Sequence, residues 1–212
     1  MAETSVANTL LIGAVGGAIT AAVQYGFRRY GETQQQRREI VETHLLQLQN
    51  SAESLYYRAN NLLDWAGKTV MTDDYYVMTS AFAFGRVLAH EQQLMAKGVY
   101  AKLNRSDRLK RDMKTCLHTI NLNMDDQVFL HYHRVLLAEM LLDQDRLITF
   151  GEFLKRWGDS AFAVPASSAG KFVQTLPRDR LEKIRDAAGQ LVRLLERETQ
   201  VPSALTLAVH SE

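Results

Sequence analysis

The longest apolar run in the chain occupies residues 6–27, "VANTLLIGAVGGAITAAVQYGF", and contains no side chain that is charged at neutral pH. About 20 helical residues span the ~30 Å hydrocarbon core of a bilayer. A cleaved signal peptide begins with a positive region, whereas the only charge before this run is Glu3. We therefore expect a transmembrane helix over 6–27. A buried helix of a soluble domain is the alternative.

The charges that flank this run predict its orientation. Arg28, Arg29, Arg37 and Arg38 follow it, and no Lys or Arg precedes it. The positive-inside rule then predicts a single-pass protein of the inner (plasma) membrane, with its N-terminus outside and its main domain in the cytoplasm. We expect the four arginines to contact lipid head groups at the membrane surface. The expected boundaries are 1–5 for a short extracytoplasmic N-terminus, 6–27 for the transmembrane helix, 28–200 for a cytoplasmic helical domain and 201–212 for a C-terminal tail.

Small residues recur along one face of the apolar run. Gly13, Gly17 and Ala21 are four residues apart and extend a GxxxG pattern by one alanine. Such a face lets two membrane helices approach closely, which predicts a homodimer through this helix. The alternative is that Gly and Ala are simply common in membrane helices.

A second pattern follows the arginines, in which apolar residues alternate at spacings of four and three. This heptad seam predicts either a coiled-coil stalk or one helix of an antiparallel bundle. Further apolar residues beside the seam widen the stripe, which favours the bundle. The eight seam positions are Val41, Leu45, Leu48, Ala52, Leu55, Ala59, Leu62 and Ala66.

The remaining pattern predicts more helices and no alternating strand. One begins at Thr72 or Asp73 and ends near Asn104, and a shorter one covers 107–120. Others begin at Asp125 or Asp126, cover "TFGEFLKRW", and run through "LPRDRLEKIRDAAGQLVRLLERET". The stretch "GDSAFAVPASSAGKFVQT", rich in small residues, predicts a loop, with one short turn of helix as the alternative. The expected fold class is all-α, with one N-terminal transmembrane helix followed by a cytoplasmic helical bundle.

Three segments carry a resemblance to known sequences: "YYVMTSAFAFGRVLAHEQQL", "LLAEML" and "ITFGEFLKRW". Together with the apolar N-terminal run, they resemble uncharacterised bacterial single-pass membrane proteins of unknown function. The resemblance covers roughly residues 6–200. It implies an anchor followed by a helical domain, and it implies no chemistry.

Composition excludes some classes of function. Lys and Arg number 25 against 24 Asp and Glu, so no strong field draws the 212-residue chain to a polyanion, and we expect no nucleic-acid partner. The one cysteine, Cys116, cannot form an intramolecular disulfide. Its neighbour His118 does not by spacing indicate a Cys/His nucleophile, and we expect a partly buried structural thiol.

A local basic cluster interrupts this charge balance at "NRSDRLKRDMK", in which the cations outnumber two aspartates. Such a cluster can contact anionic lipid, or it can be a solvated helix face. It lacks aromatic residues for stacking on bases. The cations are Arg105, Arg108, Lys110, Arg111 and Lys114.

Two patterns suggest a metal. "LDQDRLITFGEF" resembles the second half of an EF-hand loop, with Asp143, Asp145 and Glu152 at ligand positions. The loop's first and sixth positions hold Leu141 and Arg146 instead of an oxygen ligand and a glycine, so a helix–turn–helix corner is favoured over calcium binding.

The second metal pattern gathers histidines and carboxylates from several helices. His131 and His133 diverge by about 200° on a helix and do not chelate as a pair. A centre assembled across the bundle remains an alternative, with the ligands His90, Glu91, His118, His131 and Glu139.

Taken together, the sequence predicts a membrane-anchored helical interaction or scaffold protein without catalytic residues or cofactor. Its expected partners are the lipid bilayer, a second copy of the chain through the membrane helix, and an unidentified protein. The alternative is a membrane-tethered enzyme with a His/carboxylate metal centre inside the bundle.

Overall fold

The computed structural model describes residues 25, 28–32, 34–35, 38–65, 74–103, 107–144 and 146–209. The chain divides into two compact units, Met1–Ile40 and Val41–Glu212. No helix within the described ranges combines the length and the hydropathy needed to cross a bilayer. Apart from Tyr25, the predicted transmembrane helix over 6–27 lies outside these ranges, and so do its packing residues Gly13, Gly17 and Ala21.

The described part of the first unit is helical, and most of its side chains are exposed. Arg28, Arg29 and Arg38 all present exposed side chains, whereas Arg37 lies outside the described residues. Arg28 forms an ion pair with Glu32 at 3.1 Å, one helical turn later. Such an exposed pair contributes little to stability.

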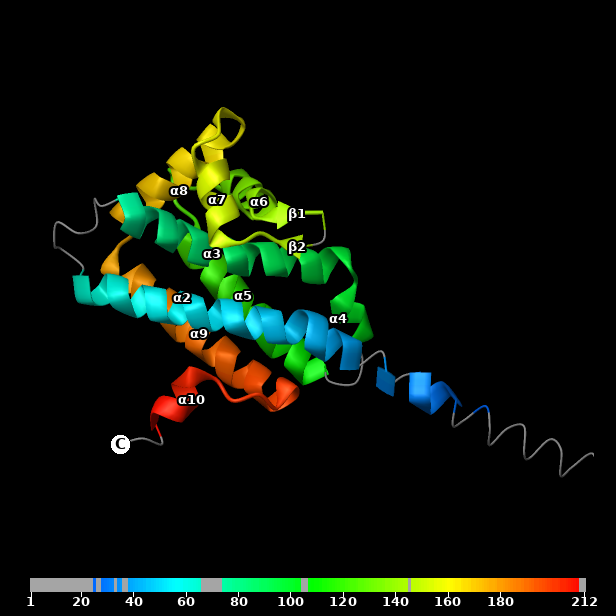
Figure 1. Cartoon of the computed structure of the whole chain (residues 1–212). Coiled ribbons are helices and arrows are strands. Elements are labelled where there is room, and N and C mark those ends of the chain that lie inside the picture. Colours follow the sequence, from blue (N-terminus) through cyan, green and yellow to red (C-terminus); the bar gives the residue numbers. More distant parts are fainter. Residues whose placement is uncertain are drawn as a thin grey trace, which may run out of the picture. The chain divides into compact units, whose positions relative to one another are not determined.

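The second unit is mostly helical, as the expected fold class requires. It begins with a single π-helical turn, η1 (Val41–Leu45), that continues into α2 (Leu46–Trp65). α2 lies alongside α9 (Arg178–Thr199), and the two run in opposite directions (Figure 1). The seam residues Leu45, Leu48, Ala52, Leu55, Ala59 and Leu62 are at most 2% exposed. The bundle interpretation of the heptad seam is therefore confirmed.

α3 (Asp74–Ala96) is the central element, with α2 against one side and α6 and α8 against another (Figure 1). The predicted helix ends earlier than expected because Gly98 adopts a left-handed conformation, with φ 61°. This conformation is available to glycine at no steric cost. The short helix α4 (Val99–Lys102) follows, and then α5 (Asp107–Met124), which packs on α9.

The remaining elements cover α3 and surround its aromatic side chains. They are α6 (His131–Met140), the strands β1 (Leu142–Asp143) and β2 (Arg146–Leu147), α7 (Phe150–Trp157), the 3-10 turn η3 (Ser160–Phe162) and α8 (Ala163–Thr175). β1 and β2 pair antiparallel, with Leu142 opposite Leu147. Each strand is two residues long, which is too short for alternation to appear in the sequence, and the pattern therefore predicts no strand here.

The loop predicted over "GDSAFAVPASSAGKFVQT" is wrong, because most of this stretch is the helix α8. The small residues that suggest a loop serve close packing instead. Ala166, Ala169 and Gly170 are buried, and a Cβ on Gly170 would meet Val77 of α3 at 3.5 Å. α6 also begins later than predicted, because Asp126 and Phe129 first form a β-bridge.

A polar cluster, here named the C-terminal clasp, fixes the end of the chain to α2 and α9. Gln49 of α2 donates a hydrogen bond to the carbonyl oxygen of Val201 at 2.8 Å, although the two residues are 152 positions apart. Glu53 accepts from the amide of Ala204 at 2.7 Å. Glu196 of α9 accepts from the hydroxyl of Thr206. The last helix, α10 (Ala204–Val209), thereby starts within the region expected as a tail.

Candidate functional site

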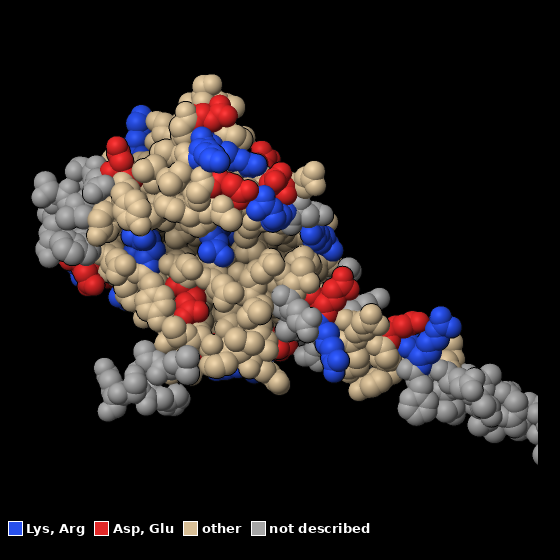
Figure 2. Space-filling view, in the orientation of Figure 1, with Lys and Arg blue, Asp and Glu red and all other residues tan. Residues whose placement is uncertain are grey.

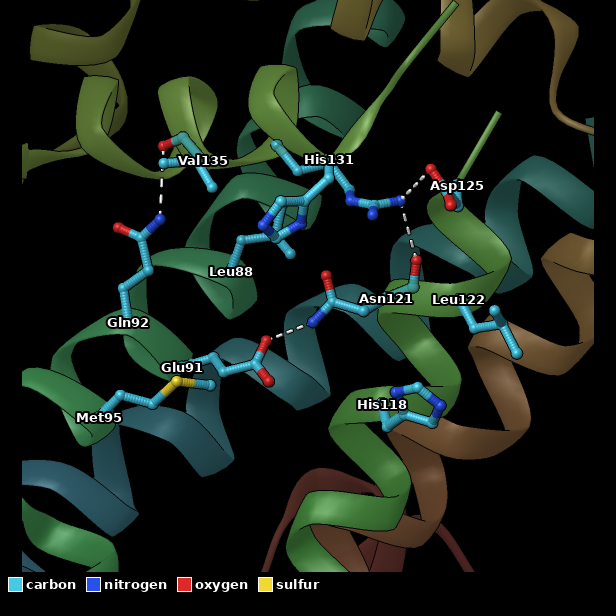
Figure 3. A pocket seen from close by; sticks show the side chains of 11 residues that line it. Leu88, Glu91, Gln92, Met95, His118, Asn121, Leu122, Asp125, His131 and Val135 are labelled. Carbon is cyan, nitrogen blue, oxygen red and sulfur yellow. Dashed lines mark hydrogen bonds and ion pairs between the residues drawn. The ribbon is translucent and has the colours of Figure 1, made fainter. Parts of the chain in front are cut away.

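A cavity of about 530 Å³ opens between α3, α5 and α6, and we name it the α3–α5–α6 cavity (Figure 3). Each helix contributes residues at helical spacing, so that they share one face. α3 supplies Leu88, Glu91, Gln92 and Met95; α5 supplies His118, Asn121 and Leu122, and Asp125 directly follows it; α6 supplies His131, Arg134 and Val135. The wall is therefore partly aliphatic, and five of its side chains can carry charge.

A chain of polar contacts crosses the cavity. The carboxylate of Glu91 accepts a hydrogen bond from the side-chain amide of Asn121, and the two side chains point toward one another (Figure 3). The backbone carbonyl oxygen of Asn121 accepts a hydrogen bond from Nη1 of Arg134 at 3.1 Å. The same nitrogen lies 3.0 Å from Oδ1 of Asp125, and the Arg134 side chain is only 8% exposed. α3, α5 and α6 are thus joined by one polar network.

The surroundings of Glu91 change its acidity. Burial raises the pKa of the Glu91 carboxyl, because the charged form loses water. The hydrogen bond from Asn121 and the charges of His118, Arg134 and His131 act in the opposite direction and do not cancel the effect. Glu91 is therefore a carboxyl group whose negative charge is incompletely compensated.

The histidines around this cavity have different roles. His118 and His131 are exposed and line the cavity. His133 is buried, and its Nδ1 accepts a hydrogen bond from the backbone amide of Leu130 at 3.2 Å, at the start of α6. Burial lowers the pKa of His133, in keeping with an acceptor nitrogen. The predicted divergence of His131 and His133 is confirmed.

The five ligands of the alternative metal centre do not come together. Glu91, His118 and His131 line the same cavity. His90 lines a different one, and Glu139 is exposed on α6 without lining either. Within the described part of the chain, no three His, Cys, Asp or Glu side chains are grouped closely enough to hold a metal ion. The described residues therefore do not form the alternative five-residue centre, because positions 90 and 91 lie about 100° apart around α3 and face different cavities.

The segment that resembles an EF-hand is a β-hairpin followed by a capped helix, in place of the favoured helix–turn–helix corner. Arg146 contacts Asp143 at 3.2 Å and Glu152 at 2.9 Å, so a guanidinium stands where the resemblance would put a cation. Glu152 also accepts from the amide of Thr149 at 2.7 Å. Arg146 and Thr149 lower the pKa of Glu152 to about 2. Asp145 lies outside the described residues.

Cys116 is buried, as expected for a structural thiol, and burial raises the pKa of its sulfhydryl. This shift disfavours the thiolate that nucleophilic chemistry needs. His118 is exposed, two positions further along α5.

The basic cluster is mostly a solvated face of α5. Arg108 lies 3.7 Å from Asp112, and Nζ of Lys114 lies 5.2 Å from the ring centroid of Tyr100. Arg111 is exposed, Lys110 is half-buried, and Arg105 lies outside the described residues. On the face shown in Figure 2, positive and negative side chains are interspersed without a broad area of one sign.

Comparison with protein-family models, curated proteins and solved structures gives no match, so the site is interpreted from its own geometry. The sequence indicates Glu91, His118 and His131 but not Asn121, Asp125 or Arg134. The one available signal is Arg134 itself, a charged residue that directly precedes the mainly apolar stretch "VLLAEML". A buried arginine requires paired acceptors, and these come from α5.

Proposed function

We propose that this chain is a single-pass membrane protein whose helical domain acts by binding, as an interaction or scaffold protein. In this proposal, residues 6–27 anchor it in the inner membrane and pack through Gly13, Gly17 and Ala21, and the flanking arginines contact lipid head groups. The observation that carries the binding role is the α3–α5–α6 cavity, in which an aliphatic wall surrounds the carboxylate of Glu91.

The chemistry of this cavity favours an alkylammonium group, which is a positive nitrogen on an apolar stem. Glu91 and Asp125 carry two negative charges against the one positive charge of Arg134 when the histidines are neutral. Within the described residues, no Lys or Arg forms an ion pair with Glu91, whose hydrogen-bond donor is the neutral amide of Asn121. An ammonium group would supply the missing countercharge in a site of low dielectric.

The aliphatic wall suits the stem of the same ligand. Leu88, Met95, Leu122 and Val135 line the cavity together with the polar network. Burial of apolar surface contributes roughly 25 cal/mol per Å², so a short alkyl chain adds affinity beyond the charge pair. A lysine side chain of a partner protein and a small alkylamine share this chemistry.

The test uses three probes of one size: butylammonium, butanol and butyrate. With the full-length chain in neutral detergent, we expect butylammonium to shift the side-chain amide resonance of Asn121, because that amide donates to Glu91. Butanol should have a weaker effect, and butyrate none. Equal shifts with butanol and butylammonium would contradict a charge-selective site.

Matched carboxyl variants locate the binding site. We expect Glu91→Gln to weaken butylammonium binding at least about tenfold, which corresponds to roughly 1.4 kcal/mol. Glu139→Gln, an exposed carboxyl of α6, should leave it unchanged. Retention of affinity in Glu91→Gln would overturn the proposal. The alternative enzyme with a metal centre receives no such support from the described residues, and we do not propose it.

A further inference from the structure

A second cavity, of about 370 Å³, opens on another side of α3, and we name it the η1–α3 cavity. η1, α2, α3 and β2 form its wall. Its charged and titratable lining residues are His44, Arg86, His90, Lys97 and Arg146, and none of the described lining residues is an aspartate or a glutamate. This cavity is therefore basic, in contrast to the one that contains Glu91.

Among the cations of this cavity, Arg86 gives the strongest indication of an anion-binding site. Its side chain is half-buried, and its guanidinium carbon lies 5.7 Å from the ring centroid of Phe82. Burial lowers the pKa of Arg86. No carboxylate forms an ion pair with Arg86 in the part of the chain that the structure describes. A partly desolvated guanidinium of this kind is stabilised by an anion that accepts its forked hydrogen bonds.

His90 lies one helical turn after Arg86 and is only 2% exposed. Its Nε2 has no hydrogen-bond partner among the described residues, although a buried polar atom normally has one. Burial and then the charges of Arg86 and His44 lower the pKa of His90 to about 3, against the effect of a hydrogen bond with Gln93. The ring is neutral at pH 7, and with the proton on Nε2 it is a donor without an acceptor.

The other cations of the cavity add positive potential with less specificity. Arg146 already contacts Asp143 and Glu152, so its charge is largely compensated. Lys97 follows the last turn of α3 and lines the same cavity. Arg86 and His90 are therefore the main hydrogen-bond donors that this cavity offers to an anion, and Lys97 supplies additional positive charge.

We propose that the η1–α3 cavity binds a phosphate monoester, with Arg86 and the Nε2–H of His90 as donors to its oxygens. A phosphate monoester offers three acceptor oxygens and close to two negative charges, which match a guanidinium, an imidazole N–H and an ammonium better than a carboxylate does. The cavity volume exceeds what a bare phosphate fills, and it leaves room for the organic part of the ligand. That part belongs either to a soluble ester or to the head group of phosphatidic acid.

The first experiment titrates the full-length chain, in neutral detergent, with two probes that share the phosphate monoester. Glycerol 3-phosphate represents the soluble ester and dihexanoyl phosphatidic acid the lipid, with dihexanoyl phosphatidylcholine as the phosphodiester control. We expect calorimetric binding of one or both monoesters and none of phosphatidylcholine. The tighter of the two identifies the source. Absence of binding by both monoesters at millimolar concentration would overturn the proposal.

Matched arginine variants separate this site from general charge effects. Arg58 also has a half-buried side chain, and its guanidinium lies 5.9 Å from the ring centroid of Tyr76, but it does not line the cavity. We expect Arg86→Gln to weaken binding of the monoester at least tenfold and Arg58→Gln to change it less than twofold. Equal losses in both variants would contradict the assignment.

A measurement on the unmodified chain keeps the test independent of variant folding. In histidine-ring NMR spectra, we expect the monoester to shift the resonances of His90 and to leave those of His118 and His131 in place. Shifts confined to His118 and His131 would place the phosphate in the other cavity and overturn this proposal. The same spectra recorded with butylammonium should show the opposite pattern, so the two proposed sites succeed or fail separately.

Discussion

At the scale of single residues, ionisation of the Glu91 carboxyl in the α3–α5–α6 cavity affects the stability of the fold. Its pKa is raised in the folded protein above the ordinary value of 4.5, so folding favours the neutral form. Its contribution to stability is fully present below about pH 4.5 and is lost as the pH rises through the folded-state pKa. Near neutral pH, the charged carboxylate therefore destabilises the fold relative to a neutral isostere.

This linkage predicts the behaviour of Glu91→Gln. We expect the variant to be more stable than the unmodified chain at pH 7, and the difference to shrink toward zero as the pH falls below 4.5. Urea unfolding at several pH values measures the difference directly. A difference that stayed constant with pH would show that the Glu91 carboxyl is not perturbed.

The same scale shows how much of the site the sequence predicts. Residue type and helical placement are sufficient to select Glu91, His118 and His131, since carboxylates and histidines inside helices are informative on their own. Sequence cannot pair them with Asn121 and Arg134, because those contacts depend on how α5 and α6 pack. It also selects Glu139, which tertiary packing leaves exposed.

At the scale of elements, Gly85 shows how closely α3 and α6 approach. A Cβ at this position would lie 2.8 Å from Cδ1 of Leu141 and 3.1 Å from Cγ of Leu137. Leu137 and Leu141 are fully buried, so neither can move without disturbing its neighbours. The glycine is needed here for space and not for backbone freedom.

We therefore expect Gly85→Ala to lower the free energy of unfolding by about 1–3 kcal/mol through overpacking. Gly151 of α7 provides the matched control, because nothing lies within 4 Å of the Cβ that an alanine would add. Gly151→Ala should raise stability by about 0.5–1 kcal/mol, as expected for alanine in a helix. Thermal or urea unfolding compares the two. Equal effects of both substitutions would contradict a tight α3–α6 contact.

The sequence predicts a helix correctly where its apolar repeat extends over many residues. The prediction fails where the local composition suits a loop and a helix equally. The seam of α2 repeats along most of the helix, so the apolar spacing alone assigns its buried face. The helix α8 is not predicted, because Ala, Ser and Gly are shared by loops and by tightly packed helices. The break at Gly98 is not predicted either, since an isolated glycine does not by itself end a helix.

At the scale of the whole molecule, the proposed anchor predicts how the chain partitions in cells. We expect the full-length protein to stay in the membrane pellet after an alkaline carbonate wash. Two arginines placed in the apolar run, Val15→Arg with Ile19→Arg, should release it, because each costs about 2.5–3.5 kcal/mol at mid-bilayer. Arginines at the exposed positions Ser54 and Gln190 serve as the control and should leave it in the pellet.

The predicted dimer contact through Gly13, Gly17 and Ala21 can be tested in the same membranes. Chemical crosslinking should give a dimer that Gly17→Leu reduces. Ala22→Leu, about 140° around the expected helix from the centre of the small-residue face, should not reduce it. Release of the unmodified chain by carbonate would contradict the anchor. An unchanged dimer in Gly17→Leu would contradict only the packing face.

The C-terminal clasp and the α2–α9 pairing also bear on how the chain is synthesised. Gln49 reaches its acceptor at Val201 only after 152 further residues have been added, and the α2 seam can pack only once α9 (Arg178–Thr199) has been made. Contacts this distant in sequence slow folding and leave apolar surface open in the meantime. While the ribosome is still translating α3 to α8, the Leu and Ala seam of α2 is therefore a natural substrate for a chaperone that binds nascent chains.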